Sequence, residues 1–193
     1  MWSKTKKALE DRLADSLKGR VKYGFEVFST KDYESEMSVF YIEVDKKRWF
    51  SSNPMYHVDA LESHNQLMSD LPADMPYWDK FYMTDKCAKI KALNLSGRLD
   101  VDSTMEHIHK YLNELSVEQC LSNEDYFYLV LAALDRRVGL RKIRLLTDSV
   151  EVYPEWVQKW IKLRATSEAS SLIARRESSR SSLLSSEKET ANQ

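Results

Sequence analysis

The apolar positions follow a helical period at the start of the chain. Leu9, Leu13 and Leu17 recur every four residues, which predicts an amphipathic helix of about four turns. Ser3 is available as its cap, and Gly19 stands where the helix would stop. We therefore expect the chain to open with a helix that turns a leucine stripe toward the core.

Apolar and polar residues alternate directly after this helix, which is the pattern of half-buried strands. In "VKYGFEVFS" (21–29) one side carries Val21, Tyr23, Phe25 and Val27, and the other carries Lys22 and Glu26. The stretch "SVFYIEVDKKRWFS" (38–51) predicts a second strand, a short turn near Asp45 to Lys47, and a third strand that carries Trp49. We expect a small antiparallel meander packed against the first helix.

The alternation is lost between residues 51 and 79, which we call the acidic connector. Asn53-Pro54, Pro72 and Pro76 interrupt it, so we expect a loop with one helix near Val58 to Met68. The acidic connector contains no Lys or Arg, so its five acidic residues give it a net charge of −5: Asp59, Glu62, Asp70, Asp74 and Asp79.

The second half of the chain returns to helical periods. Apolar residues recur through 103–115, at Met105, Ile108, Leu112 and Leu115, and Ser103 and Glu106 have the spacing of a capping box. The stretch from Tyr126 to Leu134 is apolar on nearly all sides. A helix of that kind is central and buried, and Asn123 is its expected cap and Arg137 its expected end.

A last amphipathic helix begins near Pro154, with Trp156, Val157, Trp160 and Ile161 on one face. The expected fold class is therefore α+β: a three-stranded antiparallel sheet with an N-terminal helix, followed by a C-terminal helical half. One domain is expected over residues 1–165. Residues 166–193 contain nine serines and no aromatic residue, which predicts a disordered tail with at most a helical extension at its start.

Charge is balanced overall, with 29 basic and 30 acidic residues, so no global field directs the protein to nucleic acid or to a membrane. The exception is the basic strip, defined as Arg136, Arg137, Arg141, Lys142 and Arg144. In one interpretation its arginines end a helix that Gly139 closes and pair with the acidic connector. In the other the basic strip binds nucleic acid or phosphate. We favour the first.

Residues that could carry catalysis or bind metal do not form a known motif. Glu106 and His109 have the Glu-x-x-His spacing of di-metal sites, but the chain has no second copy of that pair. His107 and the two histidines near the connector, His57 and His64, are expected at the surface. Cys87 and Cys120 are expected to be free thiols. We therefore expect no metal and no cofactor, and no catalytic motif indicates an enzyme.

The longest purely apolar run, Leu129 to Leu134, is far shorter than the roughly 20 residues that span a bilayer. The amino terminus "MWSKTKKALEDRL" has no apolar signal-peptide core. A cytoplasmic protein without membrane contact is expected.

Three blocks carry a resemblance: "MWSKTKKALEDRLADSLKGRVKY", "FYIEVDKKRWF" and "LAALDRRVGLRK". In this order they resemble a family of small, uncharacterised bacterial cytoplasmic proteins. The resemblance covers residues 1 to about 50 and roughly 100 to 165, and leaves out the acidic connector and the tail. Members of that family tend to have Gly-Lys-Arg where this chain has Gly139-Leu140-Arg141. The resemblance implies no activity and no site residues.

The leading functional hypothesis is a cytosolic protein-binding or regulatory module. Tyrosine and tryptophan dominate binding hot spots, so the candidate contact residues are the aromatic residues of the sheet and connector: Trp49, Tyr56, Tyr77 and Trp78. Two alternatives stay open. One is nucleic-acid or phosphate binding through the basic strip, and the other is an enzyme of a type that the sequence does not reveal.

Overall fold

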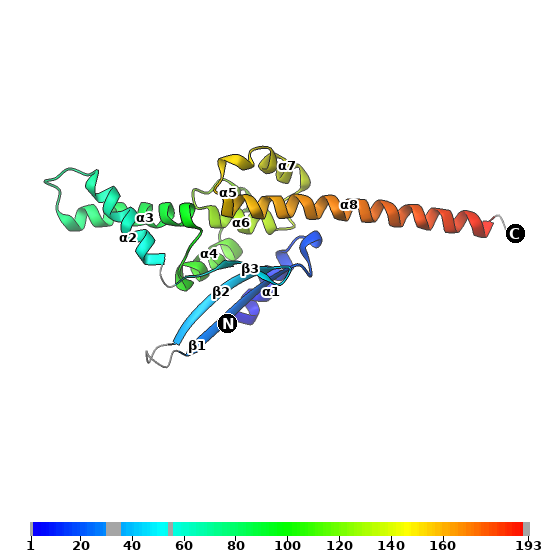
Figure 1. Cartoon of the computed structure of the whole chain (residues 1–193), viewed down its shortest axis with the longest axis horizontal. Helices are drawn as coiled ribbons and strands as arrows, with labels where there is room; N and C mark the ends of the chain where they lie inside the picture. The colour runs from blue at the N-terminus through cyan, green and yellow to red at the C-terminus, as the bar shows by residue number, and fades with distance from the viewer. Residues whose placement is uncertain (1, 30–35, 54–55, 191–193) are drawn as a thin grey trace.

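The computed structural model describes residues 2–29, 36–53 and 56–190 (Figure 1). Helix α1 (Trp2–Arg12) opens the chain but ends about one turn earlier than the leucine spacing predicts. The cause is a pairing with a distant segment: the Ala14 N–H donates to the Leu134 carbonyl (2.9 Å), and the Arg136 N–H donates to the Arg12 carbonyl (2.8 Å). A short 3-10 turn, η1 (Asp15–Leu17), follows, and Gly19 then turns the chain with a φ of 81°.

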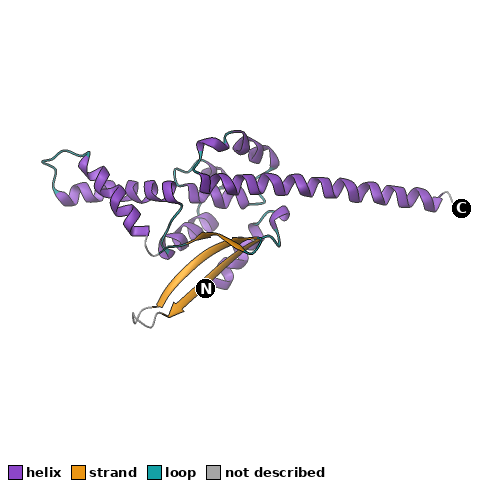
Figure 2. Ribbon diagram, in the orientation of Figure 1, coloured by secondary structure: helices purple, strands orange, loops and turns teal. Residues whose placement is uncertain are grey.

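The predicted antiparallel meander is confirmed, as strands β1 (Val21–Ser29), β2 (Glu36–Val44) and β3 (Lys47–Ser51) in the order β1-β2-β3 (Figure 2). The hairpin between β2 and β3 turns through Asp45 and Lys46, both with positive φ, as a two-residue turn matched to the strand twist requires. The inner face pairs apolar residues across the strands, for example Phe25 with Phe40 and Ile42 with Phe50.

The C-terminal helical half is also confirmed. Its helices are α2 (Tyr56–Ser69), α3 (Tyr77–Ser96), α4 (Val101–Asn113), α5 (Val117–Leu121), α6 (Tyr126–Leu134), α7 (Leu140–Asp148) and α8 (Glu155–Thr190), with the 3-10 turn η2 (Val150–Val152) before the last. Every residue of α6 after Tyr126 is buried, as its all-round apolar sequence predicts. The helix α3 is a difference from the sequence analysis, which placed only one helix in and around the acidic connector.

Several helix ends differ from the predictions. Asp100, and not Ser103, caps α4, and Asp125, and not Asn123, caps α6 by accepting from the Phe127 N–H. Gly139 does not close α6 in a left-handed conformation. It has a φ of −72° and is the N-cap of α7, because α6 already ends at Leu134 where the chain pairs with the end of α1.

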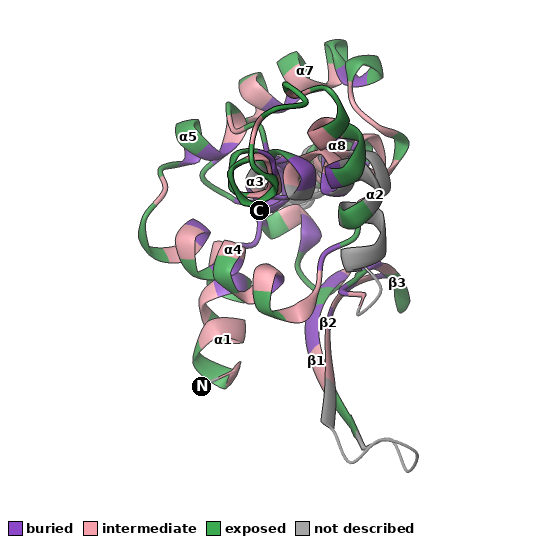
Figure 3. Cartoon of the chain, turned by 90° about the vertical axis from the view of Figure 1, so that its left-hand side faces the viewer, coloured by how far each residue is buried: buried purple, intermediate pink, exposed green. Residues whose placement is uncertain are grey.

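One core joins the sheet to the helices, and Figure 3 shows the buried residues concentrated where they meet. The rings of Phe50 on β3 and Phe127 on α6 lie 4.8 Å apart between centroids. Trp49 packs edge-on against buried Trp160 of α8, at 5.2 Å. These aromatic contacts fix the sheet beneath α6 and α8.

Helix α8 continues far past the core and points away from the rest of the molecule (Figure 1). The serine-rich segment continues this helix as far as Thr190. None of the helices within the described ranges combines the length and the apolar character that crossing a membrane requires.

Candidate functional site

Helices α2 and α3 form a hairpin that projects from the body of the protein (Figure 1). Pro76 precedes α3, and Gly97 ends it with a φ of 66°. Within the hairpin, His64 of α2 is buried against the Phe81 ring of α3, at 4.4 Å between centroids.

The first turns of α3 expose a cluster of rings that we call the aromatic tip, defined as Tyr77, Trp78, Phe81, Tyr82 and Met83. Four of its side chains are largely exposed: Tyr77 by 60%, Trp78 by 63%, Tyr82 by 75% and Met83 by 60%. The rings contact one another, with Trp78 lying 5.2 Å from Tyr77 and 5.8 Å from Phe81. Contiguous exposed apolar surface of this kind is uncommon on monomers and marks interaction sites.

The segment that leads into the aromatic tip carries three aspartates, and Lys80 is a basic residue beside the last of them. Asp70, Asp74 and Asp79 are exposed, and none of the three forms an ion pair with another residue that the structure describes. Asp79 also lies in the first turn of α3, where the helix dipole favours a carboxylate. The aromatic tip is therefore apolar at its centre and acidic at its edge.

The base of the hairpin is anchored through Asn94. Its side-chain amide donates to the Glu124 carbonyl (2.7 Å), and its side-chain oxygen accepts from the Tyr126 N–H (3.0 Å). Its backbone carbonyl accepts from the indole of Trp156 on α8 (3.0 Å). These bonds hold the C-terminal end of α3 against α6 and α8 and leave the aromatic tip at the free end.

Of the aromatic residues proposed from sequence whose side chains the structure describes, Tyr77 and Trp78 lie together and Trp49 lies elsewhere. Trp49 packs on Trp160, and the Lys159 ammonium donates to its backbone carbonyl (2.7 Å). The side chain of Tyr56 lies outside the described residues. Sequence reasoning missed Phe81, Tyr82 and Met83 because it did not predict α3. The available signal was the pair of helix boundaries at Pro76 and Gly97 with an apolar position every three or four residues between them.

The residues of the basic strip differ in whether they form an ion pair. Arg137 pairs with buried Asp135 (2.6 Å), and Lys142 pairs with Glu118 of α5. Arg136, Arg141 and Arg144 are exposed, and their side chains contact no acidic residue among those the structure describes. The pairing partners in the described part of the chain are thus on α5 and in the strip's own loop. The pairing expected with the acidic connector is not found there.

The buried carboxylate of Asp135 fixes the position of the Arg137 side chain. Burial would raise the pKa of this carboxyl, but hydrogen bonds from Arg137 and from the Tyr111 hydroxyl (2.7 Å) lower its pKa below the usual value. The carboxylate therefore stays charged inside the protein. Arg137 is a structural partner of that charge, and its side chain is still 41% exposed.

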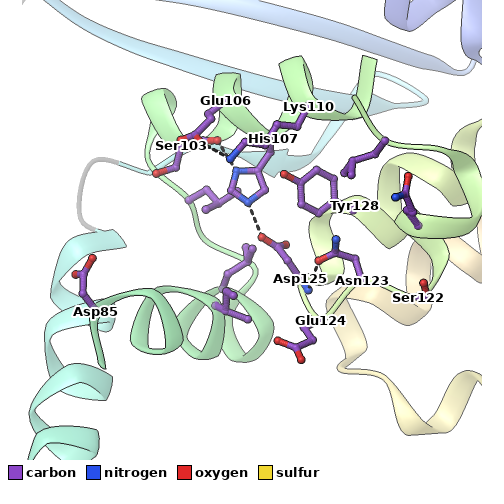
Figure 4. A pocket seen from close by; sticks show the side chains of 15 residues that line it. Asp85, Ser103, Glu106, His107, Lys110, Ser122, Asn123, Glu124, Asp125 and Tyr128 are labelled. Atoms are coloured by element: carbon purple, nitrogen blue, oxygen red, sulfur yellow. Dashed lines mark hydrogen bonds and ion pairs between the residues drawn. The ribbon is translucent and has the colours of Figure 1, made fainter. Parts of the chain in front are cut away.

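A second cluster surrounds His107, which the sequence analysis placed at the surface. The ring is instead half-buried between α4 and the start of α6 (Figure 4). Its Nδ1 lies 2.5 Å from the Ser103 carbonyl oxygen, and its Nε2 pairs with the Asp125 carboxylate. Burial alone would lower the pKa of His107, but Asp125 and the Ser103 carbonyl outweigh burial and raise this pKa above 6.5.

This pair does not have the form of a catalytic base. Both ring nitrogens face acceptors, so both carry hydrogen, and the imidazolium has no lone pair for a substrate. Asp125 also caps α6 with its other oxygen, which accepts from the Phe127 N–H (2.9 Å). The ion pair between His107 and Asp125 therefore connects α4 to the beginning of α6.

The remaining histidines and cysteines whose side chains the structure describes form no second cluster. His64 is buried, and not at the surface as expected, because α3 covers it, and the side chain of His57 lies outside the described residues. Glu106 accepts from Lys110, while His109 lies 3.6 Å from Glu114. Cys87 and Cys120 are free thiols, exposed and buried respectively. In the described part of the chain, no three His, Cys, Asp or Glu side chains are grouped as metal ligands.

Neither a curated protein nor a solved structure matches this chain. One family model does match it, over residues 1–165, and its match runs through the acidic connector that the resemblance of the three blocks leaves out. The tail lies beyond the match. Because the match covers most of the sequence, the chain belongs to the SF0329 protein family.

Proposed function

We propose that the protein is a binding module that docks a partner protein through the aromatic tip. The observation that supports this function is the exposure of Tyr77, Trp78, Tyr82 and Met83 on one projecting hairpin. Large aromatic side chains lose little conformational entropy on binding and bury a large area, which is why they dominate hot spots. The resemblance to bacterial cytoplasmic proteins makes the bacterial cytoplasm the expected setting.

The charge around the tip specifies the chemistry of the partner. Asp70, Asp74 and Asp79 are exposed at its edge, so a complementary surface carries lysine or arginine around an apolar centre. Two tips of two copies of this chain would bring like charges together, which opposes tip-to-tip dimerisation. The proposed occupant is therefore a different protein with a basic, apolar surface.

Affinity capture from an extract of the source cell, followed by quantitative mass spectrometry, tests this function. The wild type is compared with the double variant Trp78→Ser, Tyr82→Ser. We expect at least one protein to be depleted by about tenfold or more in the variant, because loss of a hot-spot ring costs about 2 kcal/mol or more.

The matched control is the double variant Val27→Ser, Phe28→Ser, which also removes exposed apolar side chains but at the end of β1. It should retain the same protein. Asp74→Asn and Asp79→Asn together should weaken capture, most strongly at low salt. A set of captured proteins that is the same for the wild type and the tip variant would contradict the proposal.

A second candidate function is supported by the unpaired part of the basic strip. Arg136, Arg141 and Arg144 are exposed without acidic partners among the described residues, which the internal ion-pair interpretation does not explain. If they bind nucleic acid, mobility-shift assays should show binding that weakens steeply between about 50 and 200 mM salt. Arg141→Glu with Arg144→Glu should abolish that binding without unfolding the protein. Absence of salt-dependent binding would leave protein docking alone.

A further inference from the structure

Strand β1 forms one edge of the sheet, and among the described residues only β2 pairs with it. Helix α1 contacts its inner face, where the Trp2 ring lies 5.6 Å from the Phe25 ring between centroids. The far end of the hairpin of β1 and β2 extends past the helices (Figure 3). There Val27 is 55% exposed on the inner face and Phe28 is 45% exposed on the outer face. A long edge strand with exposed apolar side chains is a template for pairing with another strand.

The hydrogen bonds of Phe40 on β2 show which backbone groups point out of this edge. The Phe40 N–H donates to the Ser52 hydroxyl (2.9 Å), and the Phe40 carbonyl accepts from the Ser52 N–H (2.8 Å). Both groups of Phe40 therefore point away from β1. Phe25 is opposite Phe40 on β1, so the two form a non-hydrogen-bonded pair. The N–H and carbonyl of Phe25 then point away from β2, toward the free edge.

This direction alternates along β1, so Val21, Tyr23 and Val27 also turn their N–H and carbonyl groups to the free edge. Arg20 is even-numbered, and its carbonyl accordingly accepts from the Asp45 N–H at the end of β2 (2.9 Å). None of the outward groups bonds to a described residue outside the sheet. The edge therefore presents a row of backbone donors and acceptors.

The opposite edge of the sheet is covered. It is formed by β3, which has only five residues. The Lys159 ammonium of α8 donates to the Trp49 carbonyl of β3 (2.7 Å), and the Trp49 ring packs on Trp160. The edge formed by β1 is therefore the more accessible one for another chain.

The charges of β1 suit pairing with a second copy of the same strand. On the outer face Lys22 is exposed and forms no ion pair with a described residue. Gly24 lies midway between Lys22 and Glu26. When two such strands run antiparallel with Gly24 opposite Gly24, Lys22 of each copy faces Glu26 of the other. Glu26 pairs with Arg48 in its own copy, but its side chain is still 34% exposed and can accept from a second cation.

The same register satisfies the backbone. Val21 faces Val27 of the other copy, and Tyr23 faces Phe25. Each of these pairs joins two residues whose groups point outward, so each exchanges two hydrogen bonds. A shift of the register by two residues would keep such bonds, but it would bring Lys22 opposite Gly24 or Phe28 and lose the charge pairs.

Gly24 also fits the centre of this arrangement. The two Gly24 residues would form a non-hydrogen-bonded pair, in which the Cα atoms approach to about 4.5 Å. A Cβ at Gly24 would lie 2.1 Å from the Tyr41 ring, so that ring occupies the outer face where a side chain would otherwise stand. The glycine therefore brings no side chain of its own to the closest approach of the two strands.

We propose that two copies of the protein associate through the free edges of their β1 strands, antiparallel and with Gly24 at a two-fold axis. The contact joins the two three-stranded sheets into one. It uses the same surface of both copies, so it closes at a dimer. The dimer contact is separate from the aromatic tip and does not depend on the proposed docking function.

Sedimentation velocity of the full chain tests the association. Between about 1 and 300 µM we expect a shift from monomer to dimer, with a Kd of about 100 µM or lower. Lys22→Glu places like charges opposite each other at both ends of the contact and should weaken the dimer by about tenfold. Lys47→Glu, on the opposite edge of the sheet, is the matched control and should sediment as the wild type does. A monomer at every concentration, or equal weakening by the two charge reversals, would overturn the proposal.

A mixture of two variants tests the register. Lys22→Glu and Glu26→Lys should each associate weakly alone, but their equimolar mixture should form heterodimers, because every glutamate then faces a lysine. Melting curves check that both variants are folded. If the mixture associates no more strongly than its components, the strands do not pair in this register.

Val27→Pro provides a test that leaves Glu26 and its pair with Arg48 intact. It removes an N–H that points to the free edge, so no hydrogen bond to β2 is lost. We expect a folded protein whose dimer is weakened by about tenfold. If this variant is folded and dimerises as the wild type does, the β1 edge is not the contact.

Discussion

Gly97 determines how α3 meets α8. It takes up a left-handed conformation, with a φ of 66°, and its N–H donates to the Leu93 carbonyl (2.7 Å). A Cβ at this position would also lie 2.7 Å from the ring of Trp156. Two separate physical constraints, backbone conformation and close approach of a ring, therefore require glycine here.

We expect Gly97→Ala to destabilise the protein by about 1–3 kcal/mol, because alanine is strained in the left-handed region and displaces Trp156. Urea denaturation measures the change. The matched control is Gly139→Ala, since Gly139 has an ordinary φ and open space around it. It should change the free energy of unfolding by less than about 1 kcal/mol. Equal effects of the two substitutions would contradict this account of Gly97.

His107 predicts a pH dependence. Its pKa is raised above 6.5 in the folded protein, so its contribution to stability is complete below about pH 6.5 and is lost as the pH rises through the folded-state pKa. Denaturation measured from about pH 6 to 9 should show a fall in the free energy of unfolding that levels off above that pKa.

The variant His107→Gln should remove this fall, since glutamine does not titrate. His109→Gln is the control, because His109 is an exposed histidine two residues away on the same helix. It should keep the fall. A pH profile that is identical in wild type and His107→Gln would show that the pair with Asp125 does not contribute to stability.

Among the elements, α6 is the one whose burial the sequence predicts most directly. Leu134 is 1% exposed at its end, where the chain also pairs with Ala14. We expect Leu134→Ala to destabilise the protein by about 2–5 kcal/mol, because truncation leaves a cavity in a close-packed interior. Leu172→Ala, on the free part of α8, should have almost no effect in the same denaturant titration. Similar small effects would place the core elsewhere.

The elements that the sequence predicts share one property: their pattern of apolar residues is set by the core that they contact. The strands and α6 follow this rule, and so does the buried face of α8 at Val157 and Trp160. Helix α3 is harder to predict because its first turns expose rings, and its apolar pattern marks a buried face only farther along, at Ala88 and Leu93. The exposed rings of the aromatic tip therefore make α3 difficult to predict from its sequence.

Contacts between distant segments could not be predicted from local patterns. The end of α1, the N-cap role of Gly139 and the burial of His107 each depend on a partner from elsewhere in the chain. Tyr77 and Trp78 were identified because tyrosine and tryptophan are frequent in hot spots. Their grouping with Tyr82 depends on helical geometry that only the structure supplies.

For the whole molecule, the boundary between domain and tail lies later than residue 165. Ser167 is buried and accepts from Arg20 (2.7 Å), and Glu168 pairs with buried Arg164 (3.0 Å) and accepts from the Ser16 hydroxyl (2.7 Å). These two residues contact the domain, although they stand in the serine-rich segment. Beyond them, α8 extends away from the rest of the chain (Figure 1).

Two truncations test this boundary. Deletion of residues 172–193 should leave the melting temperature unchanged. This part of α8 extends away from the core and therefore buries too little apolar area to contribute to stability. Deletion of residues 166–193 should lower it by about 5 °C or more, because Arg164 then stays buried without its carboxylate partner. Calorimetry measures both. A large drop with the shorter deletion would show that the tail docks on the domain.

The pairing of residues 12–14 with residues 134–136 also affects the order in which the protein can form as it is synthesised. The Arg12 guanidinium donates to the carbonyls of Tyr111 (2.7 Å) and Leu112 (2.5 Å), at the end of α4. None of these partners exists until about a hundred further residues have been made, which takes roughly 10 s at ordinary elongation rates. During that time Leu9, Leu13 and Leu17 have only the sheet to cover them, so we expect the nascent chain to expose apolar surface.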